Sequence, residues 1–281
     1  MMQTSRISTL FRKWCVAMML LGWGAMIAPV AADATQPAST VKVRIAVNHA
    51  PPYRNLHTTP PSGFYIELFN AVMRRLGWEP QYIDVPFRRA LFMMERGDAD
   101  VMLGPVQTPE RRAYMDYVVA AFPPERRLFL FRDPQHQIFQ YADLKGRTIG
   151  TLRGASYFEP FDSDLDLLKE MSSDYENALR MLERGYVDVV IIPELQSIEL
   201  QNQLGLKMPA SRFFAPGEPA WITMSRNSPL IHRREELARA VEEFFYEPEY
   251  ETLFLQYLAR KPGPDDYPFK LHPPATPATA P

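Results

Sequence analysis

The sequence predicts an α/β protein built from two similar lobes, because one helix-to-strand unit occurs twice along the chain. Residues 94–103 and 182–191 share the pattern Glu-Arg-Gly-x-x-Asp-Val. Each copy follows a helical pattern, reaches a glycine that suits a left-handed helix end, and continues into a short apolar run typical of a buried parallel strand. Helix, glycine, acid and strand form half of an α/β unit.

The elements of the first lobe can be followed in order. Residues 41–47 alternate apolar and polar side chains, which predicts a strand, and the proline pair at 51–52 ends it. From Phe64 the apolar side chains fall on one helical face, and Gly77 is the expected end of that helix. A second helix leads into the first copy of the repeat and ends at Gly97.

The second lobe repeats this order. Residues 147–151 predict its first strand and residues 153–156 the turn beyond it. Ser173-x-x-Glu176 predicts a capping box at the start of the next helix, which ends at Gly185. We expect each lobe to hold a mostly parallel sheet. Ligands of such sheets bind beyond the carboxyl ends of the strands, so two facing lobes predict a small-molecule cleft.

Asp100 and Asp188 occupy the same place in the two copies of the repeat. Each follows a helix end and precedes a buried strand, away from the predicted cleft. We therefore interpret both as structural carboxylates and not as a catalytic pair.

Residues 1–32 predict a secretory signal peptide with cleavage after Ala32, or else after Ala34. Basic residues at the start precede an apolar run over 14–27 that is too short to span a membrane comfortably, and small residues follow it. The segment 261–281 is rich in proline and alanine and is expected to be a loosely ordered tail.

Composition excludes several classes of function. The formal net charge of −2 argues against nucleic-acid binding. The single cysteine forms no internal disulfide, and the five histidines lack metal-ligand spacing. The chain has neither a Gly-x-Ser-x-Gly elbow nor a Gly-x-Gly-x-x-Gly turn, so we expect no hydrolase site, no metal and no nucleotide cofactor.

The motifs, in their order and spacing, resemble the bacterial extracellular solute-binding proteins of family 3, the periplasmic polar-amino-acid class. The resemblance covers about residues 41–258. The segments that carry it are Pro52-Tyr53, Gly63-Phe64, Leu76-Gly77, Phe87–Leu91, Gly97–Asp100, Thr108-Pro109-Glu110-Arg111, Tyr117, Asp143-Leu144-Lys145-Gly146, Gly154-Ala155-Ser156 and Gly185-Tyr186-Val187-Asp188.

The resemblance implies a periplasmic-binding-protein fold of type II, with a hinge and a ligand cleft between the lobes. Lobe 1 would comprise 41–132 plus 219–260, and lobe 2 the inserted segment 133–218, with crossings near 131–134 and 217–221. It also implies a monomer in the periplasm that closes on its ligand and is recognised by a membrane partner.

Matching positions imply the binding site. Arg111 falls on the family arginine that clamps a ligand carboxylate, for which a guanidinium fork is suited. Ser156 falls where a hydroxyl and amide meet the same carboxylate. Phe87 and Tyr53 fall near the aromatic walls, although core packing explains Tyr53 equally well.

Two departures concern specificity. Gly104 and Val106 stand where family members often present serine side chains, so only backbone groups remain there. Pro193 replaces the aspartate that holds a ligand ammonium.

Two charged residues, Glu194 and Arg153, leave the charge of the ligand open. Either Glu194 takes over the ammonium, or the ligand has none. Arg153 either adds a second positive charge near Arg111 or points to solvent. Two arginines without the aspartate favour an anionic ligand, a dicarboxylate or an acidic amino acid.

Three functions remain open. The first is delivery of a small carboxylate-bearing solute, an amino acid or related organic acid, to an inner-membrane ABC permease. The second is a sensor or accessory protein without a transport partner. The third, which we disfavour, is a dehydratase on the same fold, with Glu194 as general acid and Arg111 holding the substrate. We expect the protein not to be an enzyme.

Overall fold

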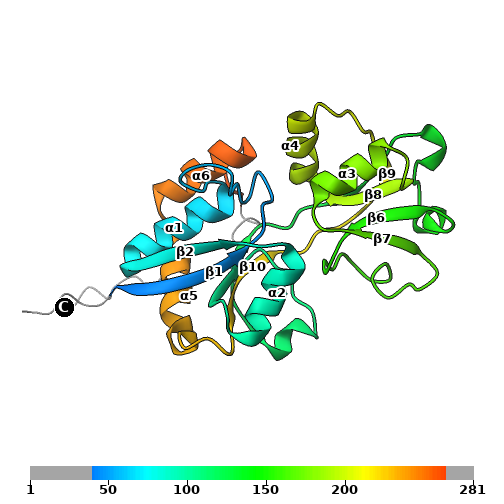
Figure 1. Cartoon of the computed structure of the whole chain (residues 1–281). Coiled ribbons are helices and arrows are strands. Elements are labelled where there is room, and N and C mark those ends of the chain that lie inside the picture. Colours follow the sequence, from blue (N-terminus) through cyan, green and yellow to red (C-terminus); the bar gives the residue numbers. More distant parts are fainter. Residues whose placement is uncertain (1–39, 264–281) are drawn as a thin grey trace, which may run out of the picture. The chain divides into compact units, whose positions relative to one another are not determined.

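The computed structural model describes residues 40–263 (Figure 1). The predicted signal peptide at 1–32 and positions 264–281 of the predicted tail lie outside the described residues. No helix within 40–263 is both long and apolar enough to cross a membrane.

The first sheet has five strands in the order β2-β1-β3-β10-β4. Its strand β1 pairs in parallel with β2 and β3, whereas β10 runs antiparallel to β3 and β4. The elements of this lobe are β1 (Val41–Val47), α1 (Phe64–Leu76), β2 (Trp78–Asp84), α2 (Phe87–Arg96), β3 (Val101–Leu103), η1 (Arg111–Ala113), β4 (Met115–Phe122), β10 (Ala220–Ser225), η4 (Ile231–Arg233), α5 (Arg234–Phe244) and α6 (Pro248–Leu258).

The second sheet also has five strands, in the order β7-β6-β8-β5-β9. Here β6 pairs in parallel with β7 and β8, and β5 runs antiparallel to β8 and β9. The elements are β5 (Arg127–Phe131), η2 (Pro134–His136), η3 (Tyr141–Leu144), β6 (Thr148–Leu152), β7 (Leu168–Ser172), α3 (Tyr175–Glu183), β8 (Val189–Pro193), α4 (Glu194–Leu204) and β9 (Ala210–Ala215).

The sheets are more mixed than the sequence predicted. Each has two parallel and two antiparallel pairings, because the chain crosses from one sheet to the other and returns. The outward connection is residues 123–126 and the return is residues 216–219. The predicted first crossing near 131–134 is too late, since strand 127–131 already pairs with β8 and β9.

The helix ends follow mainly the predicted pattern. Gly77 and Gly97 adopt left-handed φ values of 65° and 74° beyond α1 and α2. The predicted capping box of α3 is wrong by one residue: Asp174 is the N-cap and accepts the amide of Asn177 at 2.7 Å, while Ser173 bonds to the Asp174 carboxylate.

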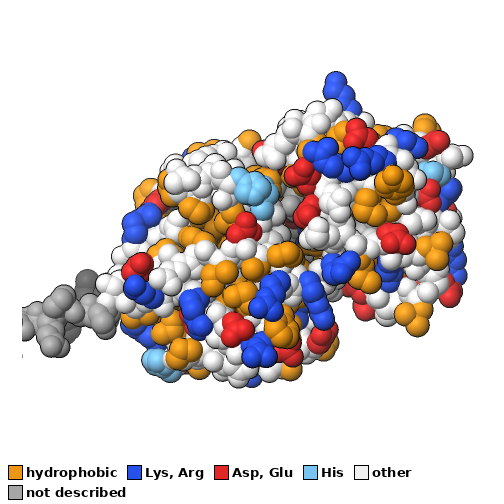
Figure 2. All heavy atoms as spheres, in the orientation of Figure 1, with side chains coloured by type: hydrophobic (Ala, Val, Ile, Leu, Met, Phe, Trp, Pro, Cys, Tyr) orange, Lys and Arg blue, Asp and Glu red, His pale blue; other side chains and the backbone are white. Residues whose placement is uncertain are grey.

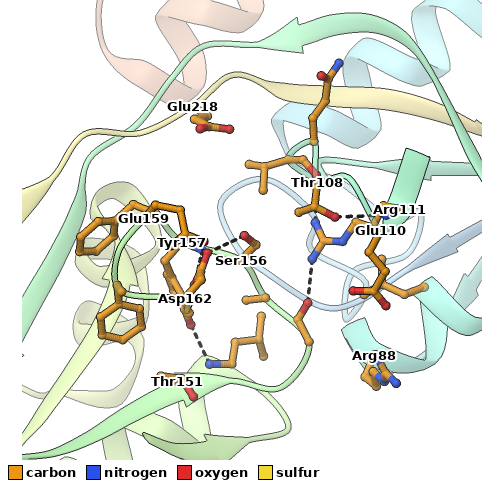
Figure 3. A pocket seen from close by; sticks show the side chains of 18 of the residues that line it. Arg88, Thr108, Glu110, Arg111, Thr151, Ser156, Tyr157, Glu159, Asp162 and Glu218 are labelled. Atoms are coloured by element: carbon orange, nitrogen blue, oxygen red, sulfur yellow. Dashed lines mark hydrogen bonds between the residues drawn. The ribbon is translucent and has the colours of Figure 1, made fainter. Parts of the chain in front are cut away.

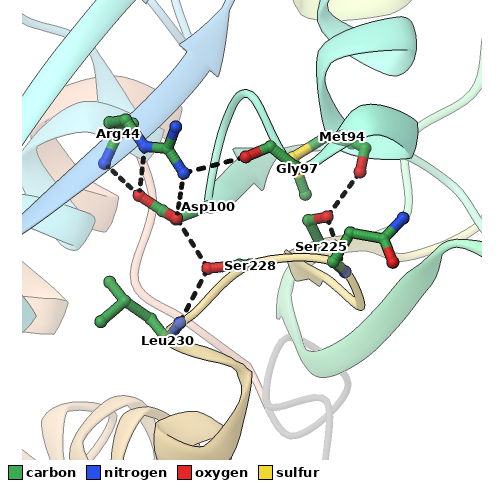
Figure 4. Close-up of polar contacts among 8 residues, drawn as sticks. Arg44, Met94, Gly97, Asp100, Ser225, Ser228 and Leu230 are labelled. Carbon is green, nitrogen blue, oxygen red and sulfur yellow. Dashed lines mark hydrogen bonds and ion pairs between the residues drawn. The ribbon is translucent and has the colours of Figure 1, made fainter.

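The two repeat aspartates tie neighbouring parallel strands together. Asp100, 2% exposed, accepts the backbone amide and the guanidinium of Arg44 in β1, and the hydroxyl of Ser228 at 2.6 Å (Figure 4). Asp188 accepts the amide of Thr148 in β6 at 2.8 Å. Burial raises the pKa of Asp100, but these hydrogen bonds outweigh it and leave the pKa below its usual value. Both carboxylates are structural, as predicted.

Apolar side chains fill the space on both faces of the first sheet. Helices α1, α5 and α6 pack together around Phe64, Phe244 and Tyr250, all of them buried, while α2 packs against β1, β3 and β10. In the second lobe, α3 packs on β6, β7 and β8. These cores fix the loops at the carboxyl ends of the strands, where the cavities described next are found.

Candidate functional site

Residues of both lobes line three cavities that share walls. The largest, about 640 Å³, is drawn in Figure 3 and is lined by Thr108 and Arg111 of the first lobe and by Ser156 and Asp162 of the second. A narrow cavity of about 80 Å³ shares Arg111 and Ser156 with it. A third, about 580 Å³, shares Asn48, Tyr175 and Gln196 with the narrow cavity.

Arg111 lies where the large and narrow cavities meet. It is only 4% exposed, and its guanidinium donates to the carbonyl oxygens of Val106 at 2.9 Å and Gly154 at 2.8 Å, one in each lobe. The guanidinium also lies over the ring of Phe87, 5.7 Å from its centroid. Burial lowers the pKa of Arg111. Within residues 40–263, no carboxylate comes within 4.0 Å of this charge.

Ser156 faces Arg111 across the large cavity (Figure 3). Its hydroxyl donates to Asp162 at 2.7 Å, and the same carboxylate accepts the amide of Tyr157 at 2.8 Å. The sequence analysis did not identify Asp162, because nothing in its local pattern separates it from the other acids of that loop.

The two predicted aromatic side chains both line the narrow cavity. Phe87 is the first residue of α2 and supports the Arg111 guanidinium. Tyr53 stacks on Tyr65 with a centroid distance of 4.9 Å, and its hydroxyl donates to the carboxylate of Glu125. Tyr53 therefore both packs in the core and reaches the cavity wall.

Gly104 and Val106 present backbone groups, and the structure shows why. The Val106 carbonyl already accepts hydrogen bonds from Arg111 and from the Tyr117 hydroxyl. At position 104, a Cβ atom would lie 2.5 Å from Nη1 of Arg54. The space that a serine side chain would need is filled by this arginine.

Arg153 and Glu194 do not line either cavity that contains Arg111. Arg153 is exposed, with Nη2 3.5 Å from the carbonyl oxygen of Met171. The Glu194 carboxylate accepts a hydrogen bond from Nε of Arg126 at 2.8 Å. Its neighbour Pro193 lines the narrow cavity, but Glu194 does not. Neither side chain supplies a charge beside Arg111 in this structure.

Three other charged residues that the sequence analysis missed line the narrow cavity: Arg54, Glu125 and Arg127. Glu125 accepts the Tyr53 hydroxyl and the backbone amide of Leu195, and burial raises the pKa of its carboxyl. Arg127 donates to the Glu125 carbonyl at 2.9 Å. The sequence does contain a pattern that could have indicated two of them: Arg54 and Glu125 each follow a proline pair soon after a strand.

The described part of the chain holds no cluster of three histidine, cysteine or acidic side chains suited to a metal ion. Arg111 itself is suited to binding an anion, because its buried guanidinium keeps N–H groups beyond the two that donate to Val106 and Gly154.

Comparison with known proteins bears on this arrangement. A family model described as bacterial extracellular solute-binding proteins, family 3, matches residues 43–259. No curated protein sequence matches the chain.

Several solved structures share the two-lobed periplasmic-binding-protein fold of type II, as the sequence predicted. A periplasmic protein of Salmonella typhimurium with high arginine specificity is 16% identical, with 78% of this chain and 99% of that one covered and a TM-score of 0.67. The GluR0 ligand-binding core from Nostoc punctiforme, solved with L-glutamate, is 17% identical, with coverage of 78% and 100% and a TM-score of 0.66. A histidine kinase sensor domain is 18% identical, with coverage of 80% and 98% and a TM-score of 0.66.

The family model spans well over half of the chain, and its range includes all but the first two residues of the two sheets and every residue that lines the three cavities. The chain belongs to the bacterial extracellular solute-binding proteins, family 3.

Proposed function

We propose that this protein is a periplasmic binding protein that captures a small carboxylate-bearing solute between its lobes and presents it to an inner-membrane ABC transporter. The observation that carries the proposal is the buried guanidinium of Arg111, which lines the cavity shared by both lobes. It binds backbone carbonyls of both lobes and has no carboxylate partner within residues 40–263.

A buried cation without an anionic partner is costly, and a ligand carboxylate would relieve that cost. Arg111 retains N–H groups beyond the two that donate to Val106 and Gly154, so it can receive a carboxylate without losing those bonds. Phe87 and Ser156 line the same narrow cavity: the Phe87 ring lies against the guanidinium, and the Ser156 hydroxyl donates to Asp162.

Because these groups come from two lobes, a ligand that touches both favours the arrangement in which they are close. The ligand shifts the equilibrium between open and closed lobes only by its differential affinity for the two states. A membrane partner would then recognise the closed state of the two lobes.

The face shown in Figure 2 supports a small-molecule role over a nucleic-acid role. Basic and acidic side chains are interspersed on it, with no broad basic surface.

A sensor or accessory role is the second candidate. It is favoured by the match to a histidine kinase sensor domain with the same fold. Copurification with a permease supports transport, whereas copurification with a membrane kinase supports sensing.

The dehydratase alternative has no support from the site. It needs Glu194 in the cleft as general acid, and that carboxylate instead pairs with Arg126, which is exposed.

Thermal melts of the chain from residue 33 onward would test the proposal across amino acids, dicarboxylates, aromatic acids and polyamines. A binding solute at about 100 times its Kd adds roughly 2.7 kcal/mol to the free energy of unfolding. We expect Arg111→Ala to abolish this stabilisation while the unliganded fold persists. The matched control is Arg112→Ala, whose exposed guanidinium contacts Gln107 at 2.5 Å. Equal ligand stabilisation in both variants would refute the clamp.

A further inference from the structure

We propose that Arg54 is a second anion-binding group in the cleft, and that the solute is a short dicarboxylate without an amino group. This inference rests on the proposed function, because it assumes that Arg111 holds one carboxylate. It assigns the other carboxylate to Arg54, a residue on the loop after β1.

Arg54 is held as firmly as Arg111. It is 8% exposed and lines the narrow cavity. Its guanidinium donates to the Asn48 carbonyl at 3.2 Å, the Asn48 side chain at 3.1 Å and the Leu103 carbonyl at 2.9 Å. All three acceptors are uncharged, and among the described residues no acidic side chain forms an ion pair with Arg54.

The backbone of the first lobe is shaped to receive this side chain. Leu103 ends β3, and the next residue, Gly104, has no side chain where the guanidinium lies. A Cβ atom there would be 2.5 Å from Arg54 Nη1 and 2.7 Å from the Tyr65 ring. Gly104, which stands where the family often has serine, therefore leaves the space that the Arg54 guanidinium occupies. A positive charge takes the place of a neutral hydroxyl at this point of the wall.

The charges of the narrow cavity favour a dianion. Its lining holds three guanidinium groups, on Arg54, Arg111 and Arg127, and one carboxylate, on Glu125. Arg127 lies beside Glu125, with its Nη1 2.9 Å from the Glu125 carbonyl and 4.0 Å from the carboxylate, so these two charges offset each other. Arg54 and Arg111 remain as two uncompensated positive charges.

The donors available also fit two carboxylates. A guanidinium has five N–H groups. Arg54 uses three of them for Asn48 and Leu103 and keeps two, while Arg111 uses two for Val106 and Gly154 and keeps three. Each arginine thus has enough donors left to bind one carboxylate through both oxygens.

An ammonium group would find little compensation in this cavity. Among the described residues, the one carboxylate that lines it is that of Glu125, which already accepts from Tyr53 and Leu195 and lies 4.0 Å from the guanidinium of Arg127. Pro193 lies at the wall in place of the family's aspartate. An α-amino acid would therefore bury its charged amine with only an already shared carboxylate to offset the charge.

Calorimetric titration of the purified chain tests this inference with matched small acids. The probes are succinate, its monomethyl ester, butyrate and aspartate. We expect succinate to bind at least about 10-fold more tightly than the monoester, butyrate or aspartate, because each of those lacks the second carboxylate or adds an amine. This comparison uses the unmodified protein, so it does not depend on any variant folding.

Two variants locate the effect. Arg54→Gln should weaken succinate binding by about 10- to 100-fold and remove most of its advantage over butyrate, whereas Arg112→Gln should change the binding of neither acid. Circular dichroism verifies that the Arg54 variant is folded.

The outcomes separate this inference from the proposed function. If the monoester or aspartate binds as tightly as succinate, or Arg54→Gln leaves succinate binding unchanged, the dicarboxylate assignment is wrong while a carboxylate-binding function stands. If neither these probes nor any member of the wider solute panel binds, both are overturned.

Discussion

The hydroxyl of Tyr53 donates a hydrogen bond to the carboxylate of Glu125, and the same carboxylate accepts the backbone amide of Leu195. Tyr53 belongs to the loop after β1, Glu125 to the first connection between the sheets, and Leu195 to the first turn of α4. One partly buried side chain in the connection therefore bonds to both lobes.

Replacing Glu125 should destabilise the protein. Glu125→Ala leaves the Tyr53 hydroxyl and the Leu195 amide without their acceptor, and we expect a loss of about 1–3 kcal/mol in the free energy of unfolding, measured with urea. The control is Glu194→Ala, which removes an ion pair with the exposed Arg126 and should cost less than about 1 kcal/mol. Equal losses in the two variants would contradict a structural role for the Glu125 carboxylate.

The pKa of Asp100 predicts how its contribution depends on pH. Its pKa is lowered in the folded protein, so the folded state favours the ionised form. The stabilisation is present above the ordinary value of 3.8 and is lost as the pH falls through the lower folded-state pKa. We expect Asp100→Asn to be clearly less stable than the native chain at pH 6, with a smaller difference at pH 3.

Urea unfolding at the two pH values checks this prediction. Asp98→Asn is the matched control, because Asp98 is exposed and its contact with Arg96 spans 3.4 Å at the surface. A destabilisation by Asp100→Asn that is the same at both pH values would count against a charge-dependent role.

Local features explain which parts of the fold could be predicted. The helix from Phe64 and its end at Gly77 follow from an apolar face and a glycine, and both depend only on near neighbours in the chain. The structural roles of Asp100 and Asp188 likewise follow from their place between a helix end and a strand. In contrast, the sheet to which strand 127–131 belongs is decided by pairing with β8 and β9, about 60 to 85 residues further along the chain.

The candidate site was predictable to a similar degree. Arg111, Ser156, Phe87, Gly104 and Val106, all expected from their match to family positions, line the large or the narrow cavity. The sequence leaves open whether Arg153 adds a second positive charge or points to solvent; its side chain is exposed, and the cavity holds Arg54 instead. That difference depends on contacts between residues far apart, such as the hydrogen bond from Arg54 to the Leu103 carbonyl, 49 positions away.

Gly104→Ala, compared with Gly205→Ala, should separate the steric effect of a side chain at position 104 from the cost of its left-handed backbone conformation. The φ of 95° alone strains an alanine, and the added Cβ would also meet Arg54 Nη1 at 2.5 Å and the Tyr65 ring at 2.7 Å. Arg54 lies in its own set of hydrogen bonds, so the methyl group must displace it or shift the backbone. We therefore expect both a lower melting temperature and weaker succinate binding.

Gly205→Ala is the control for that experiment. Gly205 has a φ of 67° at the end of α4, and a Cβ atom there meets nothing within 4 Å. This variant carries the cost of the left-handed backbone alone, about 1 kcal/mol, and should bind succinate as the native chain does. If Gly104→Ala costs no more than Gly205→Ala and leaves succinate binding intact, position 104 has no role in placing the Arg54 guanidinium. A larger cost joined to a loss of binding would mean that the glycine at the end of β3 sets the charge of the cleft.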